Sequence, residues 1–263
     1  MESKVAIRSI AFIAAMKEEL AALLDKFAPK SEADIIHVTE GKVDITVFQF
    51  KGIKIIAALS GIGKVNSAYS TTVLLVKYHP DIVINVGVAG GFNKSQKIFD
   101  FAIAKSFVYT DVDIVNLNLK PGQIMGEPLY FPASEKLNNL IKSLEDNMSN
   151  VFAKEFPTIQ DKKICFHYGI LGSSDQFIYR DDQVKNIQKN FSDVICVEME
   201  GASIAHVCYK FEIPIVAIRS LSDIAVSEKD NTGDFSNSLE IASKSAALLS
   251  ILLVEEIAKQ QSI

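Results

Sequence analysis

Hydrophobic and polar positions along this chain follow two different periods, one typical of strands and one typical of helices. Near-continuous apolar runs at residues 7–15 and 82–86 predict strands that are covered on both faces. After the first run, apolar positions recur with helical spacing from Leu20 to Phe27, and Pro29 ends this helix. A buried strand followed directly by a helix is typical of an α/β protein.

Three runs with partial alternation come next, at residues 35–40, 43–50 and 53–59. Turn signals at Gly41 and Gly52 separate them. Runs of this length joined by short turns predict antiparallel hairpins that lead back into the sheet.

The rest of the chain continues as strands and helices of ordinary length. Further strands are predicted at residues 99–108, 162–171, 194–197 and 214–221. Further helices are predicted at residues 65–78, 180–191 and 236–260, with a polar helix within 134–160 and another that starts near Ala202. Residues 109–132 show little periodicity, which in a compact domain indicates a functional loop or a lid. Because no repeat, low-complexity tract or linker interrupts this order, we predict a single domain over residues 1–263.

Two glycine-rich segments follow predicted strands and could bring the backbone close to a ligand. Residues 61–63 open the helix that begins at Val65, where free N–H groups favour anions. The spacing differs from that of a Walker A loop. Residues 87–91 are interpreted as a tight binding turn at the carboxyl end of a strand.

Carboxylates stand at several predicted strand ends. Glu198 and Glu200 flank Met199 where an apolar run stops and a helix begins, and Glu19 comes just after the first strand. These acids could simply complement helix dipoles. However, the carboxyl ends of parallel strands meet at one edge of a sheet, so we expect Glu19, Glu200 and Asp223 to line a single crevice.

The last predicted strand adds a cation to this crevice. If the strand alternates regularly, Arg219, Leu221 and Asp223 share one face. The guanidinium of Arg219 would then reach the same crevice as Asp223. It would serve either as a structural ion pair or to position carboxylates and water.

Composition excludes several classes of protein. The 263 residues are 48% hydrophobic and 22% charged, which supports a substantial core, and a net charge of −5 makes no case for nucleic acid or an anionic membrane. Arg8 interrupts the apolar N-terminal run, which argues against a signal peptide. No window reaches the length of a membrane span.

Three cysteines in apolar surroundings indicate reduced thiols, so we expect a soluble cytoplasmic protein. The four histidines do not cluster with the carboxylates, His206 is interpreted as structural, and neither a metal nor another cofactor is expected.

Six segments, in combination and order, carry a resemblance that extends over nearly the whole chain. They are AMKEE at 15–19, SGIGKVN at 60–66, NVGVAGG at 85–91, DQFI at 175–178, VEME at 197–200 and RSLSD at 219–223. The chain resembles the bacterial 5′-methylthioadenosine/S-adenosylhomocysteine nucleosidases of the nucleoside phosphorylase superfamily. The resemblance implies an α/β domain with a central mixed, mostly parallel sheet flanked by helices. It also implies hydrolysis of the N-glycosidic bond of methylthioadenosine, S-adenosylhomocysteine and 5′-deoxyadenosine, with release of adenine.

The resemblance further implies a role for each matching residue. Asp223 would be the general acid that protonates adenine N7, and Glu19 would be the base that activates water. Glu200 would bind the ribose hydroxyls, Phe177 would stack on adenine, and the backbones of Phe177 and Ile178 would bind the edge of the base. The other implied substrate-binding residues are Met199 beneath the ribose, Met16, Ile62 and Phe235 in the apolar walls, and Glu198, Ala89, Gly90, Ser222 and Arg219. Cleavage of an N-glycosidic bond through an oxocarbenium-like sugar does need an acid at the leaving base and a carboxylate at the water.

The chain departs from the family pattern at several places. Val88 stands where the family has a small hydroxyl residue beside the catalytic water. Leu117 and Leu119 replace aromatic residues and Met125 replaces a proline, so the pocket for the 5′-substituent is expected to be apolar and different in shape. Residues 131–161 are longer than usual for the family.

The resemblance also implies a homodimer in which residues 111–130 contribute to the neighbouring site. The sequence itself shows only a long, partly apolar loop there.

Two alternatives remain: a purine nucleoside phosphorylase of the same fold, and a non-catalytic nucleoside-binding module. The phosphorylase would need an anion site, and Glu19 repels an anion there, while only Val88 favours the binding module. A related hydrolase acting on another adenine-type nucleoside, such as an aminofutalosine intermediate, fits the same residues.

Overall fold

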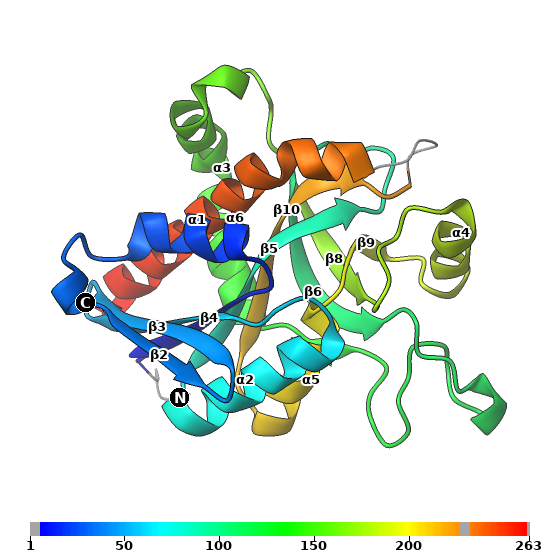
Figure 1. The fold of residues 1–263 in the computed structure, drawn as a ribbon. Coiled ribbons are helices and arrows are strands. Elements are labelled where there is room, and N and C mark those ends of the chain that lie inside the picture. The colour runs from blue at the N-terminus through cyan, green and yellow to red at the C-terminus, as the bar shows by residue number, and fades with distance from the viewer. Residues whose placement is uncertain (1–5, 227–231, 262–263) are drawn as a thin grey trace.

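The computed structural model describes residues 6–226 and 232–261. Ten strands join one mixed sheet (Figure 1). They are β1 (Ser9–Ala14), β2 (Ile36–Glu40), β3 (Val43–Phe50), β4 (Ile53–Leu59), β5 (Ile82–Gly91), β6 (Phe101–Tyr109), β7 (Phe131–Pro132), β8 (Phe166–Ser173), β9 (Val194–Glu198) and β10 (Ile215–Ile224). Their order is β10-β6-β8-β9-β5-β1-β4-β3-β2, with β7 paired to β6. Because β10 also pairs with β5, the strands β5, β10, β6, β8 and β9 close into a ring.

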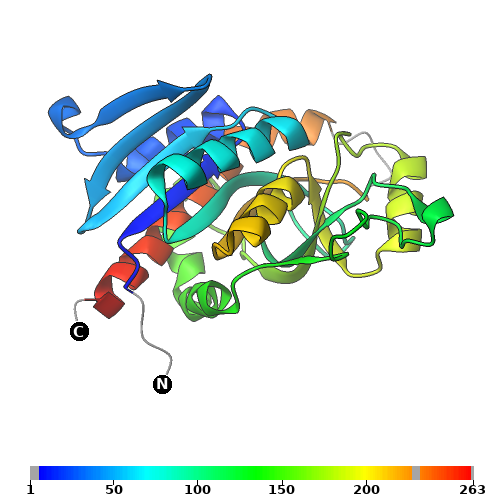
Figure 2. The same ribbon diagram turned by 90° about the horizontal axis from the view of Figure 1, so that it is seen from below.

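Helices cover both faces of this sheet. They are α1 (Lys17–Phe27), α2 (Lys64–Tyr78), α3 (Glu135–Glu155), α4 (Asp181–Asn190), α5 (Gly201–Phe211) and α6 (Thr232–Gln261), with short 3-10 turns η1 (Glu32–Asp34), η2 (Val115–Leu117) and η3 (Pro157–Ile159). The core on one face takes its helical side chains from α1, α3 and α6, and the core on the other face takes them from α2 and α5. Figure 2 shows α2 and α5 side by side on their face. None of the helices in the described part of the chain is long and apolar enough to cross a membrane.

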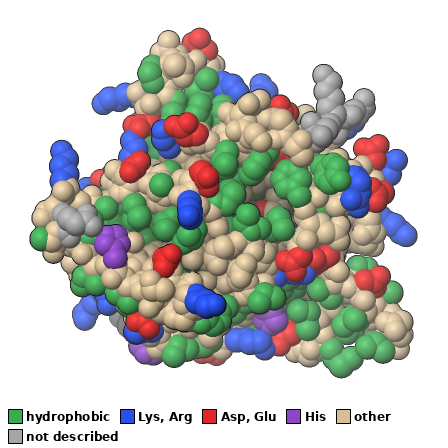
Figure 3. Space-filling view, in the orientation of Figure 1, with side chains coloured by type: hydrophobic (Ala, Val, Ile, Leu, Met, Phe, Trp, Pro, Cys, Tyr) green, Lys and Arg blue, Asp and Glu red, His purple; other side chains and the backbone are tan. Residues whose placement is uncertain are grey.

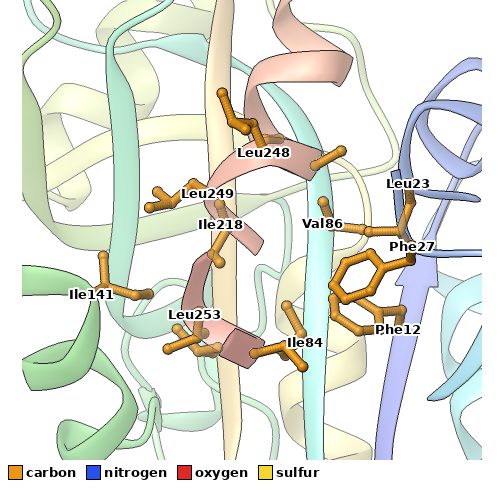
Figure 4. Close-up of a cluster of buried hydrophobic side chains, with 14 of the residues drawn as sticks. Phe12, Leu23, Phe27, Ile84, Val86, Ile141, Ile218, Leu248, Leu249 and Leu253 are labelled. Atoms are coloured by element: carbon orange, nitrogen blue, oxygen red, sulfur yellow. The ribbon is translucent and has the colours of Figure 1, made fainter. Parts of the chain in front are cut away.

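Helix α6 anchors the centre of the sheet. Its side chains Leu249 and Leu253 are fully buried and pack against Ile84 of β5 and Ile218 of β10 (Figure 4). Burial of a leucine side chain contributes about 1.5–3 kcal/mol. These contacts therefore hold the two neighbouring strands whose carboxyl ends carry glycines and Asp223.

The predicted α/β fold with a mixed sheet is confirmed. Both hairpins are present, because β2 pairs with β3 and β3 pairs with β4 in antiparallel fashion. Element ends differ by a few residues from the prediction: β8 begins at Phe166 rather than at residue 162, and α6 begins at Thr232 rather than at residue 236. Residues 110–130, between β6 and β7, form an outward-projecting loop that carries η2 (Figure 1).

The interpretation of residues 87–91 as a binding turn is wrong, because they form the second half of β5, which is buried throughout. The glycines give space to side chains from other elements. A Cβ atom on Gly87 would lie 2.2 Å from Glu19 Oε1, and one on Gly90 would lie 3.0 Å from Asp223 Oδ2. The strand can therefore pass directly beneath these two carboxylates.

The regular alternation expected along the last strand is also wrong. β10 extends to Ile224, and its register with β5 shifts between Leu221, which pairs with Ala89, and Asp223, which pairs with Gly90. An irregularity of this kind re-aims the side chains that follow it. Arg219 and Asp223 consequently reach the same region of the protein without sharing one face of a regular strand.

Candidate active site

A cavity of about 260 Å³ opens at the edge of the sheet where these strand ends meet. All of the predicted site residues except Arg219 line it, namely Met16, Glu19, Ile62, Ala89, Gly90, Phe177, Ile178, Glu198, Met199, Glu200, Ser222, Asp223 and Phe235. The wall also contains Ala15, Gln176 and Val197, which the sequence analysis did not single out. Each of them is next in sequence to a predicted site residue, and this adjacency is the only feature of the sequence that could have identified them.

Glu19 lies in the cavity wall and also caps α1. Its Oε2 accepts hydrogen bonds from the N–H groups of Ala15 and Met16, both at 2.9 Å, and its Oε1 accepts one from Val88 N–H at 2.9 Å. Burial raises the pKa of Glu19, while the nearby Arg219 and the three backbone donors work in the opposite direction. The carboxylate is thus rigidly oriented and more basic than an exposed glutamate. Glu19 therefore both caps α1 and lines the cavity.

Arg219 lies behind the cavity and is fully buried. Its Nη2 contacts Glu198 Oε2 at 2.5 Å and Asn85 Oδ1 at 2.6 Å. Glu19 Oε1 and Glu200 Oε2 lie 3.9 Å from the guanidinium. One buried cation therefore faces three buried carboxylates, so Arg219 acts as a shared counter-ion rather than as a cation exposed to the cavity.

The two acids that flank Met199 have different surroundings. Glu198 accepts hydrogen bonds from the N–H groups of Glu200 and Gly201 and from the hydroxyl of Ser173, in addition to its ion pair with Arg219. Contacts with the start of α5 and with Arg219 therefore account for the Glu198 carboxylate, although Glu198 and Glu200 both line the cavity.

Glu200 is held at the cavity by the turn that precedes α2. Its Oε1 accepts a hydrogen bond of 2.8 Å from Gly63 N–H. Gly63 adopts φ +96°, which glycine tolerates better than other residues. Burial and the charge of Glu198 raise the pKa of Glu200 to about 8. The N–H groups of this glycine turn were expected to favour an anionic ligand. In the structure, the N–H of Gly63 instead binds the side chain of Glu200.

Asp223 enters the cavity from the far end of β10. Its Oδ1 accepts a hydrogen bond of 2.8 Å from the hydroxyl of Ser222. Phe177 and Phe235 meet edge to face nearby, with ring centroids 5.6 Å apart, and form an apolar wall. The lining of the cavity therefore combines carboxylates with an aromatic surface.

An ion cluster that the sequence did not suggest ties three loops together beside the cavity. Lys64 Nζ lies 2.7 Å from Asp111 and 3.4 Å from Asp175. The Asp111 carboxylate also accepts a hydrogen bond of 2.9 Å from Asp175 N–H. The N-terminus of α2, the start of the projecting loop and the loop after β8 are thereby fixed to one another.

His206 lies outside the cavity. Its ring stacks on Phe131 and forms a hydrogen bond of 3.2 Å with the hydroxyl of Tyr109. Glu127 Oε2 of the projecting loop lies 3.5 Å from the other ring nitrogen. These contacts are structural. Residues 131–161, which hold α3 and η3, contribute nothing to the described lining of the cavity.

The raised pKa of Glu200 predicts a pH-dependent stability. The folded protein binds this proton more tightly than the unfolded chain, so its contribution is fully present below pH 4.5 and is lost as the pH rises through about 8. We expect the Tm of the unliganded protein to fall between pH 5 and pH 8.5. The Glu200→Gln variant, which cannot ionise, should show a shallower fall and a higher Tm at pH 8. One proton changes stability by at most about 1.4 kcal/mol per pH unit.

Thermal unfolding of both proteins across this pH range measures the effect. Glu240→Gln on the exposed surface of α6 is a suitable control, because contact with Lys244 lowers the pKa of Glu240 rather than raising it. Equal slopes in the wild type and the Glu200→Gln variant would contradict the raised pKa of Glu200.

Comparisons with known proteins agree with this geometry. A sequence model of the Phosphorylase superfamily matches residues 9–258. The 5′-methylthioadenosine/S-adenosylhomocysteine nucleosidase of Anoxybacillus flavithermus is 35% identical over 253 residues, which cover 95% of this chain and 100% of that protein. Among solved structures, the nucleosidase of the same name from Helicobacter pylori superposes with a TM-score of 0.83 at 30% identity, covering 96% of this chain and 100% of that one. A futalosine hydrolase of Helicobacter pylori superposes with a TM-score of 0.82 at 30% identity, covering 95% and 98%. The chain therefore belongs to the Phosphorylase superfamily and, within it, to the 5′-methylthioadenosine/S-adenosylhomocysteine nucleosidases.

Proposed function

We propose that this protein, as one nucleosidase domain, hydrolyses the N-glycosidic bond of methylthioadenosine, S-adenosylhomocysteine and 5′-deoxyadenosine and releases adenine. The observation that carries the proposal is the environment of Glu19, a rigidly held buried carboxylate in the wall of a cavity that also contains Asp223. No Lys or Arg occurs among the described residues that line this cavity. A phosphate anion would meet carboxylates there, so water is the better nucleophile.

In the proposed reaction, Asp223 is the general acid and Glu19 is the general base. A water oxygen attacks C1′ of the sugar as the bond from C1′ to N9 breaks. Asp223 gives its proton to N7, so that adenine leaves neutral, and Glu19 takes a proton from the water. The hydroxyl of Ser222 orients Asp223, and three N–H groups orient Glu19. Both groups are thus positioned before substrate arrives.

The remaining lining residues are proposed to bind the nucleoside. Glu200 accepts hydrogen bonds from the ribose hydroxyls, and Met199 lies beneath the sugar. Phe177 stacks on adenine, and the backbone of the loop that carries Phe177 and Ile178 binds the edge of the base. We assign Glu198 and Arg219 an indirect part, because their polar atoms contact other protein groups.

A futalosine-type nucleoside is the second candidate substrate. The Helicobacter pylori nucleosidase and futalosine hydrolase match this chain at the same identity, so overall similarity does not rank their substrates. The apolar walls formed by Met16, Ile62 and Phe235 favour a thioether over a polar 5′-substituent. The binding-only alternative is opposed by the presence of both Glu19 and Asp223 in the cavity wall.

We also propose that the protein is a homodimer in the cytoplasm. Val65, Tyr69 and Val76 lie on one side of α2 at helical spacing and are 80%, 49% and 56% exposed. Hydrophobic side chains also gather on the projecting loop, at the lower right of Figure 3, where Leu117 and Met125 are exposed. A second copy that covers both surfaces would remove them from water. The three free thiols suit a reducing compartment.

Turnover without phosphate tests the proposed reaction. We expect adenine release from methylthioadenosine and S-adenosylhomocysteine in phosphate-free buffer, with little release of base from inosine. Adding phosphate should not increase the rate or produce a sugar 1-phosphate. Turnover that depends on phosphate would instead establish a phosphorylase, and a much faster reaction with a futalosine-type nucleoside would establish the second candidate substrate.

Two isosteric variants test the proposed general acid and the proposed general base individually. Asp223→Asn should retain the fold and lower kcat by at least about a hundredfold, because an amide does not transfer the proton. Glu19→Gln should lower kcat similarly while changing the dissociation constant for adenine by less than about threefold. Near wild-type turnover in Asp223→Asn would contradict its role as the acid, and equal losses of turnover and affinity in Glu19→Gln would indicate a binding role.

A substitution that introduces a charge on the exposed side of α2 tests the proposed homodimer. We expect the wild type to sediment as a dimer and Val65→Glu to sediment as a monomer, because a dimer would bury two unpaired carboxylates. If residues 111–130 complete the neighbouring site, the monomer should also release adenine more slowly. Ile36→Glu places the same charge on the exposed edge strand β2 and serves as the control. A monomeric wild type would contradict the proposal.

A further inference from the structure

The side chain of Gln183, the third residue of α4, contacts the segment that carries the aromatic wall of the cavity. Its Nε2 donates hydrogen bonds to the carbonyl oxygen of Phe177 at 3.2 Å and to Gln176 Oε1 at 3.0 Å. Its Oε1 accepts hydrogen bonds from Arg180 N–H at 3.0 Å and from Tyr179 N–H at 3.2 Å. Gln183 itself is 9% exposed. One amide group thus contacts four of the five residues 176–180.

The two ends of this amide serve different purposes. The Oε1 contact with Arg180 N–H is the reciprocal half of a capping box, which α4 needs for its own stability and which a glutamate would supply equally well. The Nε2 contacts go to oxygen atoms that lie outside the helix. A glutamate could not make these contacts, because an ionised carboxylate only accepts hydrogen bonds.

Hydrogen bonds and packing together hold this segment in place, because Ile178 is buried in a hydrophobic cluster and the Phe177 ring contacts Phe235. On one side Gln176, Phe177 and Ile178 line the cavity, and on the other side Gln176 and Ile178 border a second, polar cavity of about 300 Å³. The side chain of Phe177 is 36% exposed. Apart from Gln183, a hydrogen bond of 3.0 Å from the Ser174 hydroxyl to the Gln176 carbonyl restrains the segment. A wall between two cavities has space to move on both sides when such restraints are lost.

We propose that Gln183 is a positioning residue for binding of the base: its amide NH2 group holds Phe177 and the adjoining backbone in the geometry that receives adenine. The inference rests on the proposed function, since adenine is the ligand that it assigns to this wall. Without the NH2 contacts, the segment must become ordered when the base binds, and that ordering reduces affinity. The proton chemistry is unaffected, because Asp223 and Glu19 are held by β10 and α1.

The Gln183→Glu variant tests the inference because it keeps the acceptor that caps α4 and removes both donated hydrogen bonds. We expect an unchanged Tm, about a tenfold increase in KM for methylthioadenosine and in the dissociation constant for adenine, and a kcat within about twofold of the wild type. Gln183→Met removes both the donated and the accepted hydrogen bonds of this side chain without adding charge. It should raise KM similarly and also lower the Tm. Gln188→Glu places the same charge on an exposed position of α4 and should change neither value.

Steady-state kinetics, calorimetric titration with adenine and thermal unfolding supply these values. If Gln183 only caps α4, Gln183→Glu will keep the KM and the adenine dissociation constant of the wild type, and the proposal is overturned. A lower Tm with reduced kcat and unchanged KM overturns it as well, because lost stability lowers the amount of active enzyme without changing KM. If the wild type releases no adenine, the proposed function fails separately, and the adenine dissociation constants decide the inference: equal values, or no binding by the wild type, overturn it.

Discussion

A single buried guanidinium shared among three buried carboxylates is the interaction on which this site depends. Arg219 lies 2.5 Å from Glu198 and 3.9 Å from both Glu19 and Glu200. Removing such charges from water costs several kcal/mol for each ion, so none of them is stable in the interior without the others. The four groups come from β10, from α1 and from the junction of β9 with α5. The attraction of each carboxylate to Arg219 therefore also helps to determine how these elements meet at the cavity.

Helix N-termini supply much of the polar framework around the cavity. Glu19 caps α1, Glu198 caps α5, and Gln183 caps α4. The N-terminus of α2 contributes the N–H group of Gly63, which binds Glu200. Unpaired N–H groups at the start of a helix require acceptors. In this protein the acceptors are side chains that also shape the site, so stability and site geometry share the same hydrogen bonds.

Hydrophobic periodicity predicted the fold well because most of the strands and helices bury an apolar face. Prediction failed where a local pattern has two physical meanings. Glycines in sequence resemble a turn, yet Gly87 and Gly90 lie in a strand because side chains from α1 and β10 occupy the space above them. The shift in register between Leu221 and Asp223 of β10 could not be predicted from the sequence, because it depends on how β10 pairs with β5.

The sequence by itself determined which residues are ionisable, which faces are apolar, and which segments resemble a nucleosidase, because these properties are local. The part played by each group was decided by the tertiary structure. Glu198 and Glu200 are chemically identical neighbours of Met199 and both line the cavity, but one binds the start of α5 and Arg219, whereas the other accepts a hydrogen bond from Gly63 N–H. Gln183 looked like an ordinary residue of a polar helix until the fold placed the Phe177 carbonyl beside it. A side chain's ionisation, its hydrogen bonds and the ligand it can meet depend on groups distant in the chain, and only the folded protein brings those groups together.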